Sequence, residues 1–273
     1  MRNFENLVMK RLREEGIVAE SIEIVKNNVS CKGIRVYKEG SDVSPIVYYS
    51  EQENVEAFLQ RVYDTLNSDI KNPVMRLTDP VYVKDHVYLS VQKPGEEDVV
   101  RKQYLNLELF MRITLDLGGQ TGNGSVKVTP GLVAQLGIAE DELWRCASAN
   151  SHAGASVRSM SEILGLPDTD GEQSLYVATT GQLTGGASVL YFPEVFKSFC
   201  ENYGEEACYM LPSSTEEILV LRETALDDGY LTVDELVHMV ETVNKQVDPL
   251  IQLTPAVYRY SIATDAVEII ATL

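Results

Sequence analysis

The stretch "LNLELFMRITLDL", residues 105 to 117, alternates between apolar and mostly polar side chains. Leucine, methionine or isoleucine stands at every odd position, and most even positions carry a polar or charged residue. A period of two is that of a β-strand, whose successive side chains point to opposite faces. The stretch therefore predicts one long strand with a buried face and a largely polar face.

The segments after this strand predict an antiparallel sheet with helices. The Gly- and Asn-rich "GGQTGNG" (118–124) favours a tight reversal, so "SVKV" (125–128) is expected to return beside the long strand. Thr129 and Pro130 are typical of a helix start, and "AEDELWRCASA" (139–149) predicts a helix with acids in its first turn. "SLYVAT" (174–179) and "ASVLYF" (187–192) predict two strands, and a helix is expected from Pro193 to Gly204.

The remaining C-terminal sequence predicts two hairpins and one helix. "YML" (209–211) and "ILVL" (218–221) flank a Pro-Ser-Ser-Thr turn. Thr232 and Glu235 form a capping box before an apolar helical stripe. "AVYRYSI" (256–262) and "AVEIIA" (266–271) predict a closing hairpin, and a further strand is expected around "DHVYLSV" (85–91).

The first part of the chain predicts a smaller unit. A helix ending near Gly16 is followed by three strand-like runs, and a second helix is expected behind a capping box of Ser50 and Glu53. With "NSDIKNP" (67–73) as the connection, we expect a small domain over 1–72 and a larger one over 73–273. The predicted class is α+β: helix, three-strand meander and helix, then a larger, mostly antiparallel sheet with helices packed on it.

Composition narrows the range of partners. Acidic side chains number 41 against 23 basic ones, for a formal charge of −18. Such a surface repels nucleic-acid phosphates and anionic lipids, so we expect neither nucleic acid nor membrane as a partner; an acidic DNA mimic stays an alternative. The N-terminus has no apolar signal segment, and no run reaches the about 18 apolar residues of a membrane span, which favours a cytoplasmic location. Four scattered cysteines are expected to be thiols in a reducing compartment.

Candidate chemistry is limited to one set of residues. Ser213 and Ser214 lie in the Pro-Ser-Ser-Thr turn, and His152 lies in "NSHAGAS", expected to be a small-residue loop, close to Asn150. A hydrolase site assembled from these four residues is one alternative, although no G-x-S-x-G elbow is present. The other histidines are placed in a strand (His86) and on the last helix (His238). No metal-ligand spacing and no phosphate or dinucleotide loop is found, so no metal and no cofactor are expected.

Several segments together resemble a known family. "YVATTGQLTGGASVLYFPEVF", "LPSSTEEILVL" and "VNKQVDP" occur in an order that resembles a bacterial family of uncharacterised proteins, a domain of unknown function common in gut anaerobes. The resemblance covers nearly the whole chain. It implies a cytoplasmic α+β protein and assigns no catalytic residue.

The leading functional hypothesis is therefore a non-enzymatic binding or regulatory protein. Its partner would be another protein or a small ligand, and Asn150, His152, Ser213 and Ser214 are the candidate binding residues. The hydrolase and the DNA mimic are the alternatives, and the sequence leaves the oligomeric state open.

Overall fold

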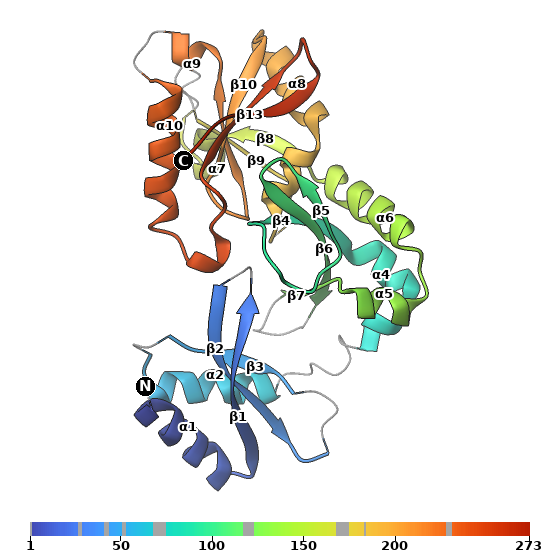
Figure 1. Ribbon diagram of the computed structural model, residues 1–273, viewed down its shortest axis with the longest axis vertical. Coiled ribbons are helices and arrows are strands. Elements are labelled where there is room, and N and C mark those ends of the chain that lie inside the picture. The colour runs from blue at the N-terminus through green and yellow to red at the C-terminus, as the bar shows by residue number, and fades with distance from the viewer. Residues whose placement is uncertain are drawn as a thin grey trace.

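The computed structural model describes residues 2–26, 29–40, 44–50, 53–67, 75–116, 123–167, 175–182, 184–227 and 231–273. The described strands form three antiparallel sheets with helices packed against them (Figure 1). The predicted α+β class is confirmed.

The first sheet belongs to the N-terminal part of the chain. Its strands pair in the order β1-β2-β3, which confirms the predicted meander. Two helices cover it, and the buried side chains of these elements form a core of their own that includes Val8, Ile34 and Phe58. The elements are α1 (Arg2–Glu14), β1 (Ile17–Lys26), β2 (Val29–Lys38), β3 (Ile46–Tyr48) and α2 (Val55–Asn67).

The start of α2 corrects one prediction. The backbone N–H groups of Glu56 and Ala57 both donate to the side-chain oxygen of Asn54, so Asn54 caps the helix. Ser50 supplies its backbone N–H to the Glu53 carboxylate. The prediction that Ser50 caps the helix was therefore wrong. A helix capped by Ser50 would begin at residue 51, whereas α2 begins four residues later, at Val55.

The second sheet is built around the strand that opened the sequence. β6 pairs with β4 on one side, and with β5 and then β7 along the other. The predicted hairpin of β6 and β7 is confirmed, and residues 117–122 of its connection lie outside the described part. β5 has no counterpart in the predictions. The strands are β4 (Val87–Gln92), β5 (Arg101–Tyr104), β6 (Leu107–Asp116) and β7 (Asn123–Lys127).

The face of β6 that was expected to be polar is partly buried. Glu108 is 7% exposed and Phe110 is fully buried. The loop between β4 and β5 approaches this face, and the backbone N–H of Gly95 donates to Glu108 at 3.2 Å. The strand also begins at Leu107, because Leu105 lies in a turn with a φ of 53°.

The third sheet has the order β13-β12-β10-β11-β9-β8. The hairpins of β10 with β11 and of β12 with β13 are confirmed. Its strands are β8 (Ser156–Ser159), β9 (Tyr176–Thr179), β10 (Ala207–Pro212), β11 (Ile218–Arg222), β12 (Ala256–Ser261) and β13 (Ala266–Thr272). The helices of this larger part are η1 (Arg76–Thr78), α4 (Pro80–His86), α5 (Pro130–Leu136), α6 (Glu140–Ala153), α7 (Met160–Leu164), η3 (Gly186–Tyr191), α8 (Pro193–Tyr203), α9 (Thr224–Asp227), α10 (Val233–Asn244) and η4 (Pro249–Ile251).

Three further local predictions, in the larger part of the chain, were wrong. Residues 187–192 were expected to form a strand, but most of them belong to the 3-10 helix η3, whose residues 186–190 are all buried. His86 is the last residue of α4 and does not lie in a strand. His152 lies in the last turn of α6 and not in a loop. The predicted helix starts at Pro130, Pro193 and Thr232 are confirmed.

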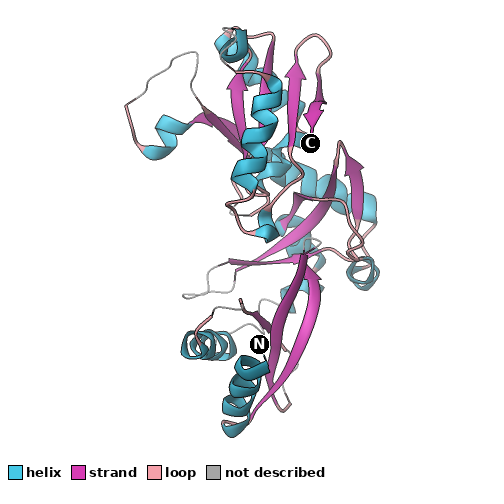
Figure 2. Ribbon diagram, turned by 60° about the vertical axis from the view of Figure 1, so that its left-hand side comes forward, coloured by secondary structure: helices cyan, strands magenta, loops and turns pink. Residues whose placement is uncertain are grey.

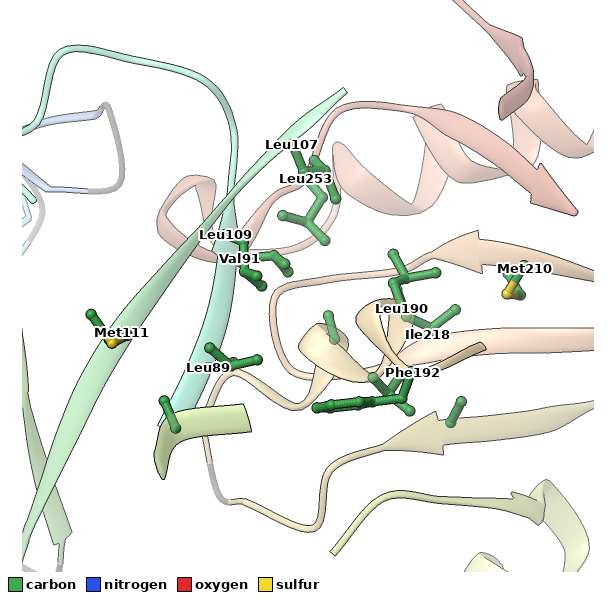
Figure 3. Packing of buried hydrophobic residues seen from close by; sticks show 14 of the residues in the cluster. Leu89, Val91, Leu107, Leu109, Met111, Leu190, Phe192, Met210, Ile218 and Leu253 are labelled. Carbon is green, nitrogen blue, oxygen red and sulfur yellow. The ribbon is translucent and has the colours of Figure 1, made fainter. Parts of the chain in front are cut away.

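The main core lies between the second and third sheets. Figure 3 shows Leu89 and Leu109, from β4 and β6, in the same cluster as Leu190 of η3 and Ile218 of β11. The core of the first 67 residues is separate from this cluster, and the two groups of elements are distinct in Figure 1 and in the turned view of Figure 2. Residues 68–74 lie outside the described part, so the domain boundary after residue 72 stays a prediction.

Candidate functional site

β8 is an edge strand of the third sheet. It follows β9 at the end of the strand order, with Arg158 opposite Val177. The N–H of Met160 donates to the carbonyl of Leu175 at 2.9 Å. Hydrogen-bonded pairs alternate with non-bonded pairs along an antiparallel ladder. Counting back two residues from Met160, the backbone of Arg158 bonds to β9. The N–H and C=O of Val157, which lies between bonded pairs, therefore point away from β9.

A groove lies between β8 and α8. One side of α8 lines it at helical spacing, and the opposite wall comes from the end of α6 and the start of β8. Its volume is about 630 Å³. Because α8 has 11 residues and lines the groove from Glu194 to Tyr203, the groove is about 15 Å long. The lining residues are His152, Ala155, Ser156, Val157, Glu194, Val195, Ser198, Phe199, Asn202 and Tyr203.

The groove has an apolar floor and a polar rim. Phe199 is 4% exposed, and its ring packs edge-on against Tyr176 of β9, with centroids 4.9 Å apart. Tyr203 contacts both of these rings. Tyr176 packs edge-on against both other rings, an arrangement that aromatic side chains favour, and this cluster forms the floor. Ser198 and Asn202 are exposed on the rim.

A polar pair closes one end of the groove. Nε2 of His152 lies 3.0 Å from Oε1 of Glu194, and both side chains are about half exposed. The imidazole also packs edge-on against Phe192. Nearby, burial together with the charges of Tyr191 and Glu194 raises the pKa of Tyr104 to about 12, so its hydroxyl stays protonated and donates to the carbonyl of Leu190.

A close backbone contact positions the turn that carries His152. A Cβ at Gly154 would lie 2.3 Å from the carbonyl oxygen of Thr180. Only glycine lets the α6–β8 turn approach the end of β9 this closely. The contact therefore sets the distance between His152 and the sheet.

Asn150 serves the fold. Its side-chain amide donates to the carbonyls of Lys84 and Val87, at 2.9 and 2.8 Å. The hydroxyl of the next residue, Ser151, accepts from the N–H of Leu89. Together these bonds attach α6 to the junction of α4 and β4, and Asn150 does not line the groove.

Ser213 and Ser214 bond to their own hairpin. Ser213 donates to the carbonyl of Glu217, and the Ser214 hydroxyl accepts from the N–H of Glu216. These are the turn contacts expected for such residues. Among the described residues, the contacts of His152 lead to Glu194 and Phe192 and not to either serine. The structure thus places His152 at the groove and the two serines in a separate turn.

The described part of the chain was also compared with three other classes of feature: a metal site, a disulfide or reactive cysteine, and a membrane-spanning helix. No group of three or more His, Cys, Asp or Glu side chains there is arranged to hold a metal ion. The four cysteines form no disulfide. A hydrogen bond with Cys200, together with burial, raises the pKa of Cys208 above its ordinary value, which disfavours the thiolate form. No described helix is long and apolar enough to cross a membrane.

Sequence reasoning missed most of the groove. The spacing of Val195, Phe199 and Tyr203 on α8 was the available signal, but a core helix has the same pattern. That β8 lies at an edge depends on a strand order that local sequence does not encode.

Comparison with known proteins places the chain in a family without naming an activity. No curated protein and no solved structure matches it. One family model matches residues 1–262, nearly the whole chain, which agrees with the resemblance seen in the sequence. The chain belongs to the family described as "Family of unknown function (DUF5688)".

Proposed function

We propose that the chain is a cytoplasmic binding protein that holds an extended peptide segment of a protein partner in the groove between β8 and α8. The observation that carries this proposal is the edge of β8 beside a groove that follows α8 over nearly its full length. The proposal makes the protein a recognition module and not an enzyme.

An extended peptide suits the groove in size and in chemistry. A strand rises by about 3.3 Å per residue, so a groove of about 15 Å takes roughly four or five extended residues. The outward N–H and C=O of Val157 offer the hydrogen bonds that an added strand uses, and Phe199 and Tyr203 offer an apolar surface for alternate side chains. Addition of a strand to a sheet edge is a common mode of peptide recognition.

Charge favours a basic partner segment. The chain carries a formal charge of −18, which attracts basic proteins and repels acidic ones. At the groove itself, the half-exposed Glu194 is placed to bind a lysine or arginine of the peptide in exchange for His152.

The hydrolase alternative has no comparable support. It requires a base within hydrogen-bond reach of a serine, and Ser213 and Ser214 bond instead to backbone groups of their turn. We therefore place only His152, of the four residues predicted from the sequence, in the proposed site.

The test selects ligands from a library of random peptides displayed on phage, with the full chain as target. Synthetic copies of the selected peptides are then titrated against Ser198→Trp, which fills the groove from its rim. Glu201→Trp is the matched control, because Glu201 is an exposed residue of the same helix that does not line the groove. We expect peptides with alternating apolar residues and at least one basic residue. Their binding should weaken at least ten-fold in Ser198→Trp and stay unchanged in Glu201→Trp.

Hydrogen exchange adds a readout of the binding mode. A bound strand should protect the amide of Val157, which points away from β9. Failure to select any peptide, or selected peptides that bind Ser198→Trp as tightly as the unsubstituted protein, would overturn the proposal.

A further inference from the structure

The first sheet is covered by helices on one face only. Buried residues of α1 and α2 form a core with alternate residues of the strands, among them Ile34 and Val36 of β2. Figure 2 shows both helices on the same side of this sheet. Because successive side chains of a strand point to opposite faces, the residues between these core positions lie on the other face, which we call the open face.

The open face is largely apolar. Directly paired residues of an antiparallel sheet share a face, so the register identifies its described members. They are Val18, Glu20, Ile22 and Ile24 of β1, Cys31, Gly33, Arg35 and Tyr37 of β2, and Ile46 and Tyr48 of β3. Their apolar side chains are partly exposed and belong to none of the buried clusters of the described residues. This apolar surface remains in contact with water, and removing it from water is favourable.

Gly33 allows the open face to be flat. A Cβ at this position would lie 2.6 Å from Cγ2 of Ile46 and 3.3 Å from the ring of Tyr48. Both side chains of β3 therefore lean over the backbone of β2, where any larger residue would push them outward. Ile22 is directly opposite Gly33 in the register, so the apolar surface continues onto β1. A flat apolar sheet face of this kind packs well against a second sheet face.

The charged side chains described on the open face are one acid and one base. Glu20 and Arg35 are directly opposite in the register, and Nη1 of Arg35 lies 3.6 Å from Oε2 of Glu20. Both side chains are exposed, so each is accessible to a partner. The open face is thus neutral, whereas the chain carries a formal charge of −18. A neutral apolar face gives a basic partner no electrostatic gain, and it brings no excess of like charge together when two copies meet there.

We propose that the open face binds the open face of a second copy of this chain, in a symmetric dimer. A two-fold axis parallel to the strands, between β1 and β2, places β1 of each copy over β2 of the other. Because Glu20 and Arg35 are directly opposite, this rotation brings each Glu20 over the Arg35 of the other copy. The charges are therefore self-complementary, as a two-fold interface requires. Sheets packed face to face lie about 10 Å apart. The proposal does not depend on the groove between β8 and α8.

The size of the open face predicts a weak dimer. One end, at Cys31 and Tyr48, lines a pocket together with Pro249 of η4 and so adjoins the larger part of the chain. β1 and β2 have 10 residues each, which makes them about 33 Å long, and three strands are about 14 Å wide. The outline is therefore at most roughly 450 Å² per copy and roughly 900 Å² per dimer, which is typical of transient association. Repulsion between the acidic surfaces, which salt screens beyond about 8 Å, also opposes the dimer.

The test is sedimentation velocity of the full chain at physiological salt, from low micromolar to near-millimolar concentration. The variant is Ile22→Glu, which adds a charge at the centre of the open face. Val25→Glu is the matched control, because Val25 lies in the same strand, is 56% exposed and points to the opposite face. Circular dichroism verifies that each variant is folded.

We expect the unsubstituted protein and Val25→Glu to change from monomer to dimer as the concentration rises. The dissociation constant of the Ile22→Glu dimer should be at least ten-fold higher. A chain that stays monomeric at every concentration, or a dimer that Ile22→Glu leaves as tight as before, would overturn the proposal.

Exchange of the two charges tests the two-fold arrangement. Glu20→Arg alone sets arginine against Arg35 of the other copy, and Arg35→Glu alone sets glutamate against Glu20, so each variant by itself should be monomeric. An equimolar mixture of the two variants should form a dimer again, because each copy then meets the opposite charge. The ion pair within one chain is lost in both variants and does not account for this rescue. A mixture that stays monomeric would show that the open faces do not meet as proposed.

Discussion

Asn150 shows how a polar residue beside a candidate site can serve the fold alone. Its amide binds the carbonyl of Lys84, in the last turn of α4, where helical carbonyls lack partners within the helix, and the carbonyl of Val87, the first residue of β4. The sequence presents an asparagine two residues from a histidine, a pattern equally typical of catalytic sites and of helix packing. Sequence reasoning had no means to separate the two, because the carbonyls come from a segment more than 60 residues away.

We predict that Asn150→Ala lowers the free energy of unfolding by about 1–3 kcal/mol, since it leaves two carbonyls without donors. Peptide binding at the groove should be unchanged once the protein is folded. Urea unfolding measures the first effect. Asn202→Ala, at the exposed rim, is the control and should stay within about 0.5 kcal/mol of the unsubstituted protein. If Asn150→Ala leaves the free energy of unfolding unchanged, Asn150 does not serve the fold, and a direct role in binding becomes the better explanation.

Gly154 carries a steric constraint that the sequence does not reveal. Gly154→Ala forces a methyl group against the Thr180 carbonyl, and we expect a loss of roughly 1–3 kcal/mol. Gly131→Ala is the comparison, because Gly131 lies exposed in α5 and a Cβ there meets only Thr129 Oγ1, at 3.8 Å. Helix propensity should make that variant more stable, by up to about 1 kcal/mol. Equal denaturation midpoints for both variants would contradict the close contact.

At the scale of elements, caps decide where helices begin. For α2, Asn54→Ala should cost about 1 kcal/mol, because it removes the acceptor of two N–H groups. Ser50→Ala should cost less, since Ser50 contributes a backbone N–H that alanine retains. Chemical denaturation of both variants checks this. If Ser50→Ala lowers the free energy of unfolding more than Asn54→Ala does, Ser50 is the cap, as the sequence predicted.

The capping box of α10 predicts a dependence on pH. The carboxylate of Glu235 accepts hydrogen bonds from the backbone N–H and from the hydroxyl of Thr232. Both lower the pKa of Glu235 below its ordinary value of 4.5, and the backbone bond has the larger effect. A carboxyl whose pKa is lower in the folded state adds stability above its unfolded pKa and loses it as pH falls through the folded one. We expect amide exchange in the first turn of α10 to accelerate below about pH 4.5 more than solvent chemistry alone accounts for. Glu235→Gln should remove this acceleration; if it persists, another group is responsible.

Helices and strands that have a signal in their own sequence were predicted correctly. Those whose conformation depends on packing against distant residues were not. Alternation found β6, and the Thr129–Pro130 pair found α5, because both signals act within one element. The segment 187–192 is apolar throughout, and a short run of that kind fits a buried strand or a buried helix equally well. Gly186 decides between them, since its backbone lies against Glu216 and Thr179 in a way that a side chain would prevent. For His86, the local signal is the Asp79–Pro80 pair, which is typical of a helix start and begins the helix that ends at His86.

At the scale of the whole molecule, the proposed groove depends on tertiary arrangement. The groove exists because β8 ends a six-stranded order and α8 runs beside it. Residue types alone did not indicate the groove.

The two separate cores predict that the N-terminal part unfolds by itself. Phe58 is fully buried in the core of residues 8–62, and Phe196 is fully buried in the main core. Replacing either phenylalanine by alanine should lower the free energy of unfolding of the part of the chain that contains it by about 3–5 kcal/mol. We expect Phe58→Ala to accelerate amide exchange in β1–β3 and to leave β10–β12 unchanged, and Phe196→Ala to do the reverse, since local opening follows cooperative units. Exchange that accelerates in both regions in either variant would mean that the cores are coupled, and the division after residue 72 would then not separate two domains.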